Sequence, residues 1–191
     1  MFERILANIN SRVQLDEEEQ AFFVSLLQKK TIRKRQYLLQ EGDVCRFEYF
    51  VNSGCLRAYT IDNKGAEHVL QFAIEDWWIG DMNSFLLQKP ARLAIDALED
   101  TEVFYLDKAS WDQLLDRVPK FDRFFRMLLQ RAFIALQERV VSGMSDTAEE
   151  RYRQFRERFP HFEQRISQRQ IASYLGITPE SLSRVRKQLA K

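Results

Sequence analysis

Residues 166–189 read ISQRQIASYLGITPESLSRVRKQL, and this stretch decides the fold of the C-terminal part of the chain. Ser167 and Thr178 each stand where a helix N-cap is expected, and Pro179 occupies the favoured first helical position. Gly176 can adopt the left-handed conformation that ends a helix. The stretch therefore predicts two helices joined by a short glycine turn, the helix-turn-helix arrangement.

The apolar residues of this stretch recur at helical spacing and predict one core shared by both helices, with the small Ala172 where the helices cross. That core comprises Ile171, Leu175, Ile177, Leu182, Val185 and Leu189. The second helix then directs its remaining side chains outward, namely Pro179, Glu180, Ser183, Arg184 and Lys187.

These outward side chains suit the reading of base edges in the DNA major groove. Glu180 can accept a hydrogen bond from a cytosine amino group, and Arg184 can donate two hydrogen bonds to guanine O6 and N7. Ser183 can contact a base or a phosphate. The alternative is a plain helical hairpin in which Glu180 only favours the dipole of its own helix.

Phosphate contacts are expected around the start of the first helix and late in the second. Ser167, Gln168 and Arg169 begin the first helix, where backbone N–H groups and the helix dipole favour an anion, and Lys187 adds a positive charge. The charge distribution agrees, because residues 146–191 hold ten Lys/Arg and six Asp/Glu, whereas residues 1–145 hold nineteen and twenty-two. A basic end on an acidic body indicates an anionic partner at that end.

The bulk properties exclude several classes of protein. No stretch approaches the roughly 20 apolar residues of a membrane helix, and the first residues do not resemble a signal peptide. Cys45 and Cys55 are too few for a disulfide scaffold or a four-cysteine metal site. We expect a cytoplasmic protein without a membrane partner, a metal site or catalytic residues.

The N-terminal part predicts helices over residues 3–9 and 15–29, followed by short strands from about 31 to 107. Apolar runs separated by Gly, Asn and Asp turns are typical of an antiparallel sandwich or barrel. Four of the six glycines lie in this region, and turns that need positive φ would explain them. They are Gly42, Gly54, Gly65 and Gly80.

After Pro119 the pattern predicts one long helix to about Val141. Its apolar residues cover more than one stripe, so the helix should pack against two partners. One partner is the sheet domain, and the second is the same helix of another subunit. The alternative is a helix buried wholly within one chain. Residues 142–145 are a candidate hinge, before a short helix over 147–158.

The chain resembles the Crp/Fnr family of bacterial transcription regulators. Glu180, Ser183 and Arg184 resemble the recognition signature of the Fnr-like branch. Residues 39–43 and 52–57 resemble the first turns of the family's β-roll. Gly80 and Asp81 resemble the start of its phosphate-binding cassette, which usually reads Gly-Glu.

The resemblance implies an α+β protein with three parts. Residues 1–117 would form an antiparallel β-roll, a cyclic-nucleotide-binding-like double-stranded β-helix that senses an effector. Residues 118–143 would form the long dimerisation helix, and residues 144–191 the helix-turn-helix domain, its β-wing absent or vestigial. The implied function is a homodimeric transcription regulator that binds a palindromic DNA operator and has RNA polymerase as a further partner.

The effector site departs from the family pattern. Cyclic-nucleotide binders place an arginine against the cyclic phosphate, but here Ala91 occupies that position and Arg92 comes one residue later. In a strand, a shift of one residue reverses the face. Gly80, Asp81 and Arg92 remain the candidate ligand site, and we expect a different small ligand, or none, in place of cyclic AMP.

Other types of sensor, and other classes of protein, would need residues that are scarce in this sequence. An iron–sulfur switch would need about four cysteines, and a haem would need a suitably placed histidine. His68 is interpreted as a sheet residue and His161 as a residue near the second domain. A cupin-type enzyme would need clustered metal-binding histidines. A ligand-binding module that acts on a protein partner is the remaining alternative.

Overall fold

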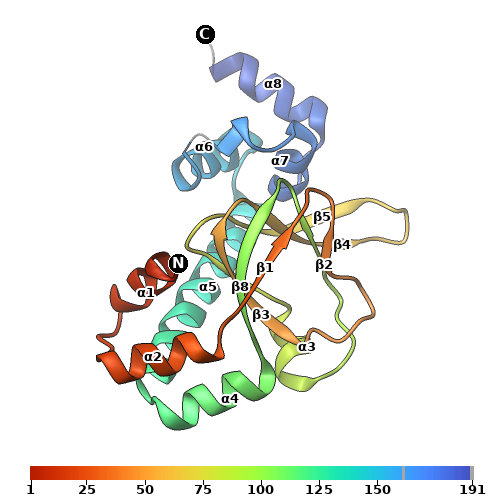
Figure 1. Cartoon of the computed structure of the whole chain (residues 1–191). Helices are drawn as coiled ribbons and strands as arrows, with labels where there is room; N and C mark the ends of the chain where they lie inside the picture. The colour runs from red at the N-terminus through yellow and green to blue at the C-terminus, as the bar shows by residue number, and fades with distance from the viewer. Residues whose placement is uncertain (161, 190–191) are drawn as a thin grey trace. The chain divides into compact units, whose positions relative to one another are not determined.

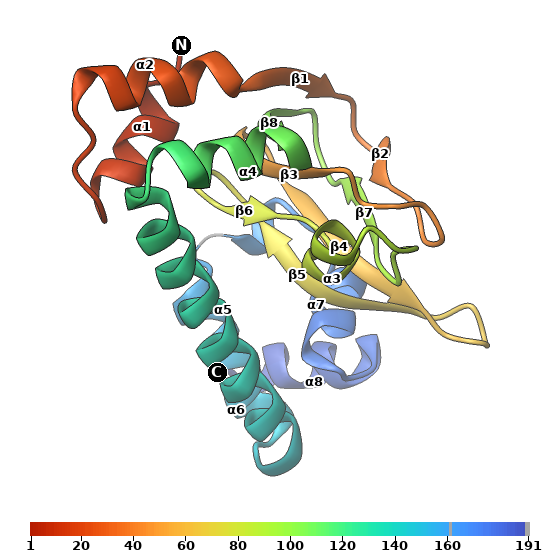
Figure 2. The same cartoon turned by 90° about the horizontal axis from the view of Figure 1, so that it is seen from below.

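The computed structural model describes residues 1–160 and 162–189 and divides into two compact units. Unit 1 comprises residues 1–60 and 71–129, and unit 2 comprises residues 61–70 and 130–191. Figures 1 and 2 show antiparallel strands together with helices along the chain. The predicted α+β class is confirmed. His161 lies outside the described residues.

Two helices begin the chain. The second starts at Asp16, whose side chain forms a capping box with Glu19. The prediction of a helix over residues 15–29 was wrong at its end, because the backbone becomes extended at Leu27 and the next residues join a sheet. The two helices are α1 (Glu3–Asn10) and α2 (Glu17–Leu26).

Within the described residues, eight strands form two four-stranded sheets, with the orders β1-β8-β3-β6 and β2-β7-β4-β5. Strands far apart in the sequence are therefore neighbours in space, as in a β-roll. Large buried aromatic side chains such as Phe50 and Phe104 fill the interior. The strands are β1 (Gln28–Ile32), β2 (Tyr37–Leu39), β3 (Phe47–Ser53), β4 (Leu56–Ile61), β5 (Glu67–Ala73), β6 (Trp78–Ile79), β7 (Ala94–Ala97) and β8 (Thr101–Asp107).

The glycines of the roll have two different roles. Gly42, Gly54 and Gly65 have positive φ, as predicted for turns. Gly54 also leaves no room for a side chain, since a Cβ atom there would lie 2.7 Å from the Asp100 carbonyl oxygen. The prediction was wrong for Gly80, which does not have positive φ. A Cβ atom there would collide with the Glu48 carboxyl group, which would have to move.

Two short helices were not predicted, of which the first lies between β6 and β7 and the second follows β8. They are α3 (Met82–Leu87) and α4 (Lys108–Arg117). Each begins at an aspartate, since Asp81 accepts a hydrogen bond from the Ser84 amide and Asp107 from the Ser110 amide. The α4 residue Trp111 stacks on Phe125 with the ring centroids 3.8 Å apart, which attaches this helix to the core.

The long helix α5 (Lys120–Ser145) has two dissimilar halves. Phe121, Phe124 and Phe125 are buried in its first turns. Its second half carries exposed apolar side chains, considered below. The predicted hinge over residues 142–145 was wrong, because these residues continue α5, which ends at Ser145. The next helix starts with the capping box of Thr147 and Glu150.

The C-terminal helices pack around a cluster of aromatic rings. Phe155 contacts Phe159, Phe162 and Tyr174 at centroid distances of 5.2 to 6.3 Å. This cluster connects the helix before the predicted helix-turn-helix to its first helix. The elements are α6 (Ala148–Arg158), the 3-10 turn η1 (Phe162–Gln164), α7 (Gln168–Leu175) and α8 (Pro179–Leu189).

Candidate nucleic-acid interface

The turn between α7 and α8 forms as its sequence predicts. Ser167 caps α7 through a reciprocal capping box with Gln170. Gly176 ends the helix in the left-handed conformation with φ +66°. The Thr178 hydroxyl then accepts a hydrogen bond of 3.2 Å from the Ser181 amide, which satisfies one of the free N–H groups at the start of α8.

Most of the side chains predicted to face DNA lie on the solvent-exposed face of α8. Leu182 and Val185 of this helix are buried within unit 2, and the opposite face of the helix is exposed to solvent. Ser183 is half-buried. The predicted residues that are exposed on this helix are Pro179, Glu180, Arg184 and Lys187.

An acceptor and a donor lie one helical turn apart on this face. The pKa of Glu180 is lowered, first by a hydrogen bond from its own backbone N–H and then by the Thr178 hydroxyl, with a smaller effect from Arg184. The Glu180 carboxylate is therefore an ionised acceptor at neutral pH. The Arg184 guanidinium donates to the Ser181 hydroxyl at 3.2 Å, which orders it on the surface.

Sequence reasoning missed Ser181 as part of this site. Its hydroxyl lies between Thr178, at 3.3 Å, and Arg184. The available signal was spacing, because residues three apart on a helix are neighbours, so Thr178, Ser181 and Arg184 form one row.

The predicted phosphate-binding residues also lie on the surface. Ser167, Gln168 and Arg169 are exposed at the start of α7, where free N–H groups and the helix dipole attract an anion. Both helices of the hairpin thus offer polar and basic side chains to a polyanion.

The candidate ligand residues of the roll meet through the backbone. The Asp81 side chain is only 5% exposed, and its two oxygens accept from the Ser84 amide at 3.0 Å and the Arg92 amide at 3.2 Å. Arg92 is itself exposed, and Ala91 is buried in the position where a phosphate-binding arginine would be expected. The amides that could cradle a phosphate therefore hold a carboxylate of the chain itself.

A second acid lies beside this segment. Glu48 is buried against Gly80, and its Oε1 atom has no hydrogen-bond partner among the described residues. Burial raises its pKa to about 8, with a further contribution from the negative charge of Asp81. Two carboxyl groups and no inward guanidinium at this segment do not fit the anionic phosphate of a cyclic nucleotide.

The arginine that does lie inside the roll is already paired. Arg57 on β4 and Asp96 on β7 are directly opposite each other, and the guanidinium donates Nε and Nη2 hydrogen bonds of 2.8 and 3.0 Å. The guanidinium also lies over the Tyr59 ring at 4.0 Å. The charge of this arginine is therefore paired within sheet β2-β7-β4-β5.

The side chains that could bind a metal are dispersed over the described part of the chain. Within residues 1–160 and 162–189, no group of three or more His, Cys, Asp or Glu side chains could hold a metal ion. His68 lies in β5, as predicted, and is exposed, with its Nε2 atom 2.9 Å from Asp62. In the same described ranges, no helix has the length and hydropathy needed to span a bilayer.

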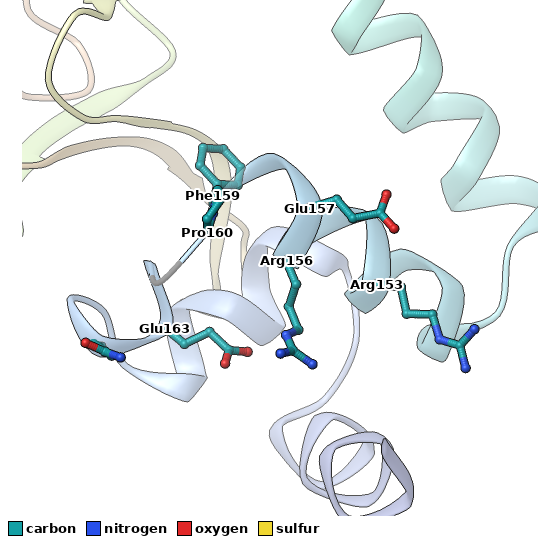
Figure 3. Close-up of a pocket in the computed structure, with 7 residues that line it drawn as sticks. Arg153, Arg156, Glu157, Phe159, Pro160 and Glu163 are labelled. Carbon is teal, nitrogen blue, oxygen red and sulfur yellow. The ribbon is translucent and has the colours of Figure 1, made fainter. Parts of the chain in front are cut away.

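Unit 2 also contains a pocket of about 510 Å³ lined by α6 and the segment that follows it (Figure 3). Arg153 and Arg156 supply positive charge, and Glu157 and Glu163 supply negative charge. The Glu163 carboxylate accepts a hydrogen bond from the Tyr152 hydroxyl. Because the lining charges are balanced, this pocket has no marked preference for an anion.

Comparison with known sequences gives a consistent set of relatives. Residues 29–118 match the family model of the cyclic nucleotide-binding domain. The regulatory protein HlyX of Actinobacillus pleuropneumoniae is 27% identical over 82% of this chain and 69% of its own length. The fumarate and nitrate reduction regulatory protein of Vibrio cholerae is 29% identical over 82% and 66%. This chain thus matches about two thirds of the length of these relatives.

Solved structures show the same fold. FixK2 from Bradyrhizobium japonicum superposes with a TM-score of 0.75 at 21% identity, covering 86% of this chain and 84% of that one. The Thermus thermophilus catabolite activator protein superposes with a TM-score of 0.59 at 24% identity, covering 96% and 86%. The likeness extends over most of the chain, from the strands to the C-terminal helices.

Proposed function

Because the chain belongs to the Crp/Fnr family of DNA-binding transcription regulators, we propose that it binds a palindromic operator as a homodimer through α7 and α8. Regulation, and not catalysis, is the proposed role, in the cytoplasm where the operator lies. Residues 1–117 are the proposed sensor, 118–143 the dimerisation helix and 144–191 the DNA-binding domain. RNA polymerase stays a predicted partner.

The observation that carries this proposal is the pair of Glu180 and Arg184, which lie exposed on one face of α8. An ionised acid on a DNA-binding surface would repel phosphates unless it had a specific donor to accept from. A cytosine amino group is such a donor, and Arg184 would bond the O6 and N7 atoms of a guanine. Pro179 and Ser183 complete the proposed base-facing surface.

Phosphate contacts would set the position of the helix in the groove. Ser167, Gln168 and Arg169 would contact one phosphate at the start of α7, and Lys187 another beside α8. These contacts would carry affinity without sequence preference.

The proposed dimer rests on an exposed apolar stripe along α5. Leu129, Phe133, Leu136 and Val140 follow one another at intervals of four, three and four residues, and each is at least 46% exposed. This spacing is the a/d pattern of a coiled coil. A matching stripe of a second copy would bury it, and a two-fold axis would pair two recognition helices with a palindrome.

Selection of binding sites from random duplex DNA at low salt tests the proposal. We expect one palindromic consensus with half-sites about one helical turn apart. Arg184→Ala should weaken binding to that consensus by about 1–3 kcal/mol and relax specificity at one base pair in each half-site. Arg46→Ala is the control, because this exposed arginine of the roll lies outside both the proposed DNA-facing surface and the proposed dimer stripe.

Failure has a clear signature. The proposal would be rejected if the purified protein showed no binding to duplex DNA, or if Arg46→Ala and Arg184→Ala lowered the affinity equally. Sedimentation of the protein as a monomer at the concentrations used for binding would reject the homodimer.

A further inference from the structure

Residues 61–70, the tip of the hairpin formed by β4 and β5, belong to the same compact unit as residues 130–191. Strand β5 is an edge strand of its sheet. The outer side of an edge strand presents backbone N–H and C=O groups that need partners, and proteins often cover such an edge. In this chain the partners are side chains of α5 and α7.

The first partner is Ser173, on α7. Its hydroxyl accepts a hydrogen bond of 3.0 Å from the Val69 amide and donates one of 2.6 Å to the Glu67 carbonyl oxygen. Residues two apart in a strand direct their backbone groups to the same edge. One serine hydroxyl therefore satisfies a donor and an acceptor on the same edge, as a neighbouring strand would.

The second partner is Arg139, on α5. Its guanidinium donates to the carbonyl oxygens of Leu70 at 2.5 Å, Val69 at 2.7 Å and Tyr174 at 2.8 Å. It also lies over the Tyr174 ring, 4.3 Å from the centroid. A planar guanidinium with five N–H donors can make such contacts at once, whereas a lysine ammonium cannot reproduce this geometry. Arg139 thus joins α5, β5 and α7 at one point.

We propose that Arg139 and Ser173 are positioning residues for DNA recognition, which hold α7 on α5 and on the hairpin tip. The recognition helix α8 shares its core with α7, since Ile171, Leu175 and Leu182 are all buried. An α7 held in one orientation therefore fixes the direction in which α8 points. In a dimer, the two fixed recognition helices would demand one spacing between half-sites.

This inference rests on the proposed function but concerns residues away from the proposed DNA-facing surface. Glu180 and Arg184 are exposed, whereas Arg139 and Ser173 are half-buried against backbone groups. Loss of either anchoring side chain should leave base and phosphate contacts in place. It should change only how rigidly the two recognition helices are held relative to each other.

Hydrogen exchange tests the anchor without DNA. Ser173→Ala removes the acceptor of the Val69 amide, and Arg139→Lys removes the guanidinium that donates to three carbonyl oxygens. Both variants should exchange backbone amides in residues 61–70 faster than the wild type. Arg131→Lys is the matched control, since Arg131 is an exposed arginine of the same helix. Unchanged exchange in residues 61–70 of both anchor variants would overturn the proposal.

A series of operators with altered half-site spacing tests the positioning role. The wild type should bind one spacing far more tightly than its neighbours. Each anchor variant should bind that spacing roughly ten-fold more weakly, a loss in the range expected for one or two lost hydrogen bonds. Its affinities for the other spacings should be nearly unchanged, so that the preference flattens, and the salt dependence should stay the same because no phosphate contact is lost.

The outcomes separate the two hypotheses. If wild-type protein ignores duplex DNA, the proposed function fails. If the wild type binds but the anchor variants keep its full spacing preference, or bind the preferred operator more tightly, DNA regulation stands and the positioning role is refuted.

Discussion

The proposed recognition helix α8 and the roll segment around Gly80 and Asp81 both resemble motifs of the family. Their polar groups, however, differ in whether a partner could reach them. On α8, the Glu180 and Arg184 side chains are exposed and available to a ligand. In the roll, the Asp81 carboxylate is buried and bonded to two amides of its own chain. A motif therefore indicates a binding site only where the structure leaves its polar groups available to a partner.

The same contrast applies to the charged groups nearby. Arg57 in the roll is paired with Asp96 in a buried ion pair, whereas Arg184 contacts only a neutral hydroxyl among the interactions described above. In the roll these polar groups bond to each other, whereas on α8 they stay exposed, as the proposed DNA contacts require. Four expected outcomes test this difference.

The largest effect should follow from Asp96→Ala. This change leaves the buried Arg57 guanidinium without its carboxylate, and breaking one side of a buried pair costs about 3–5 kcal/mol. Urea unfolding should show that loss in the free energy of unfolding. The control is Asp112→Ala, whose exposed pair with Lys108 should contribute less than about 1 kcal/mol. Equal losses in the two variants would contradict the structural role of the roll pair.

The stability of the roll should depend on pH through Glu48. Its pKa is about 8 in the folded chain, against an ordinary value of 4.5, so the folded state holds a proton that the unfolded state has released. Stability should therefore fall as pH rises from about 4.5 to about 8, by up to about 1.4 kcal/mol per pH unit. The titratable neighbours of Glu48 are Asp81, Cys45 and Tyr49.

Glu48→Gln should remove most of this slope, because the amide stays neutral at every pH. Denaturant unfolding between pH 5 and pH 8 measures it. Glu41→Gln, at an exposed position, should keep the wild-type slope. A slope that survives in Glu48→Gln would show that another group is responsible.

A smaller effect is expected from Lys187→Ala on the recognition helix. Loss of one phosphate contact should weaken binding to all sequences alike and reduce the slope of log affinity against log salt by about 1. Lys89→Ala, at an exposed position of the roll, should leave the slope unchanged. A change in base preference in Lys187→Ala would instead assign this lysine to base reading.

The smallest expected effect is none at all. Because the Ser84 and Arg92 amides already bond Asp81, and Ala91 stands where the family's arginine is expected, titration of the wild type with cyclic AMP or cyclic GMP should release no binding heat. Melting temperature should also be unaffected. Saturable binding of either nucleotide at one site per chain would remove the contrast between the roll and the recognition helix.

The helix-turn-helix was predictable nearly residue by residue. Ser167, Gly176, Thr178 and Pro179 act on backbone groups within one turn of themselves, so their effects are visible in a short window of sequence. The helices α3 and α4 were missed although both begin with Asp-x-x-Ser, an N-cap pattern. They are too short to show a clear apolar period.

Non-local contacts account for the errors in the N-terminal part. Residues 28–29 were assigned to a helix, but β1 forms because Gln28 and its neighbours pair with Tyr105 and the rest of β8. No local pattern reports a partner more than 70 residues away. The predicted hinge at residues 142–145 was wrong for a related reason, since Ser142 is buried and bonds Gln154 on α6.

Helix caps, turn glycines and the order of apolar and polar residues established the class of fold and the surface proposed to meet DNA. These features depend on near neighbours in the chain. Strand register decided that Arg57 meets Asp96, and chain folding decided that Asp81 meets the Arg92 amide and that Ser173 meets the hairpin tip. Such pairings join residues brought together by packing, and packing depends on the whole chain at once.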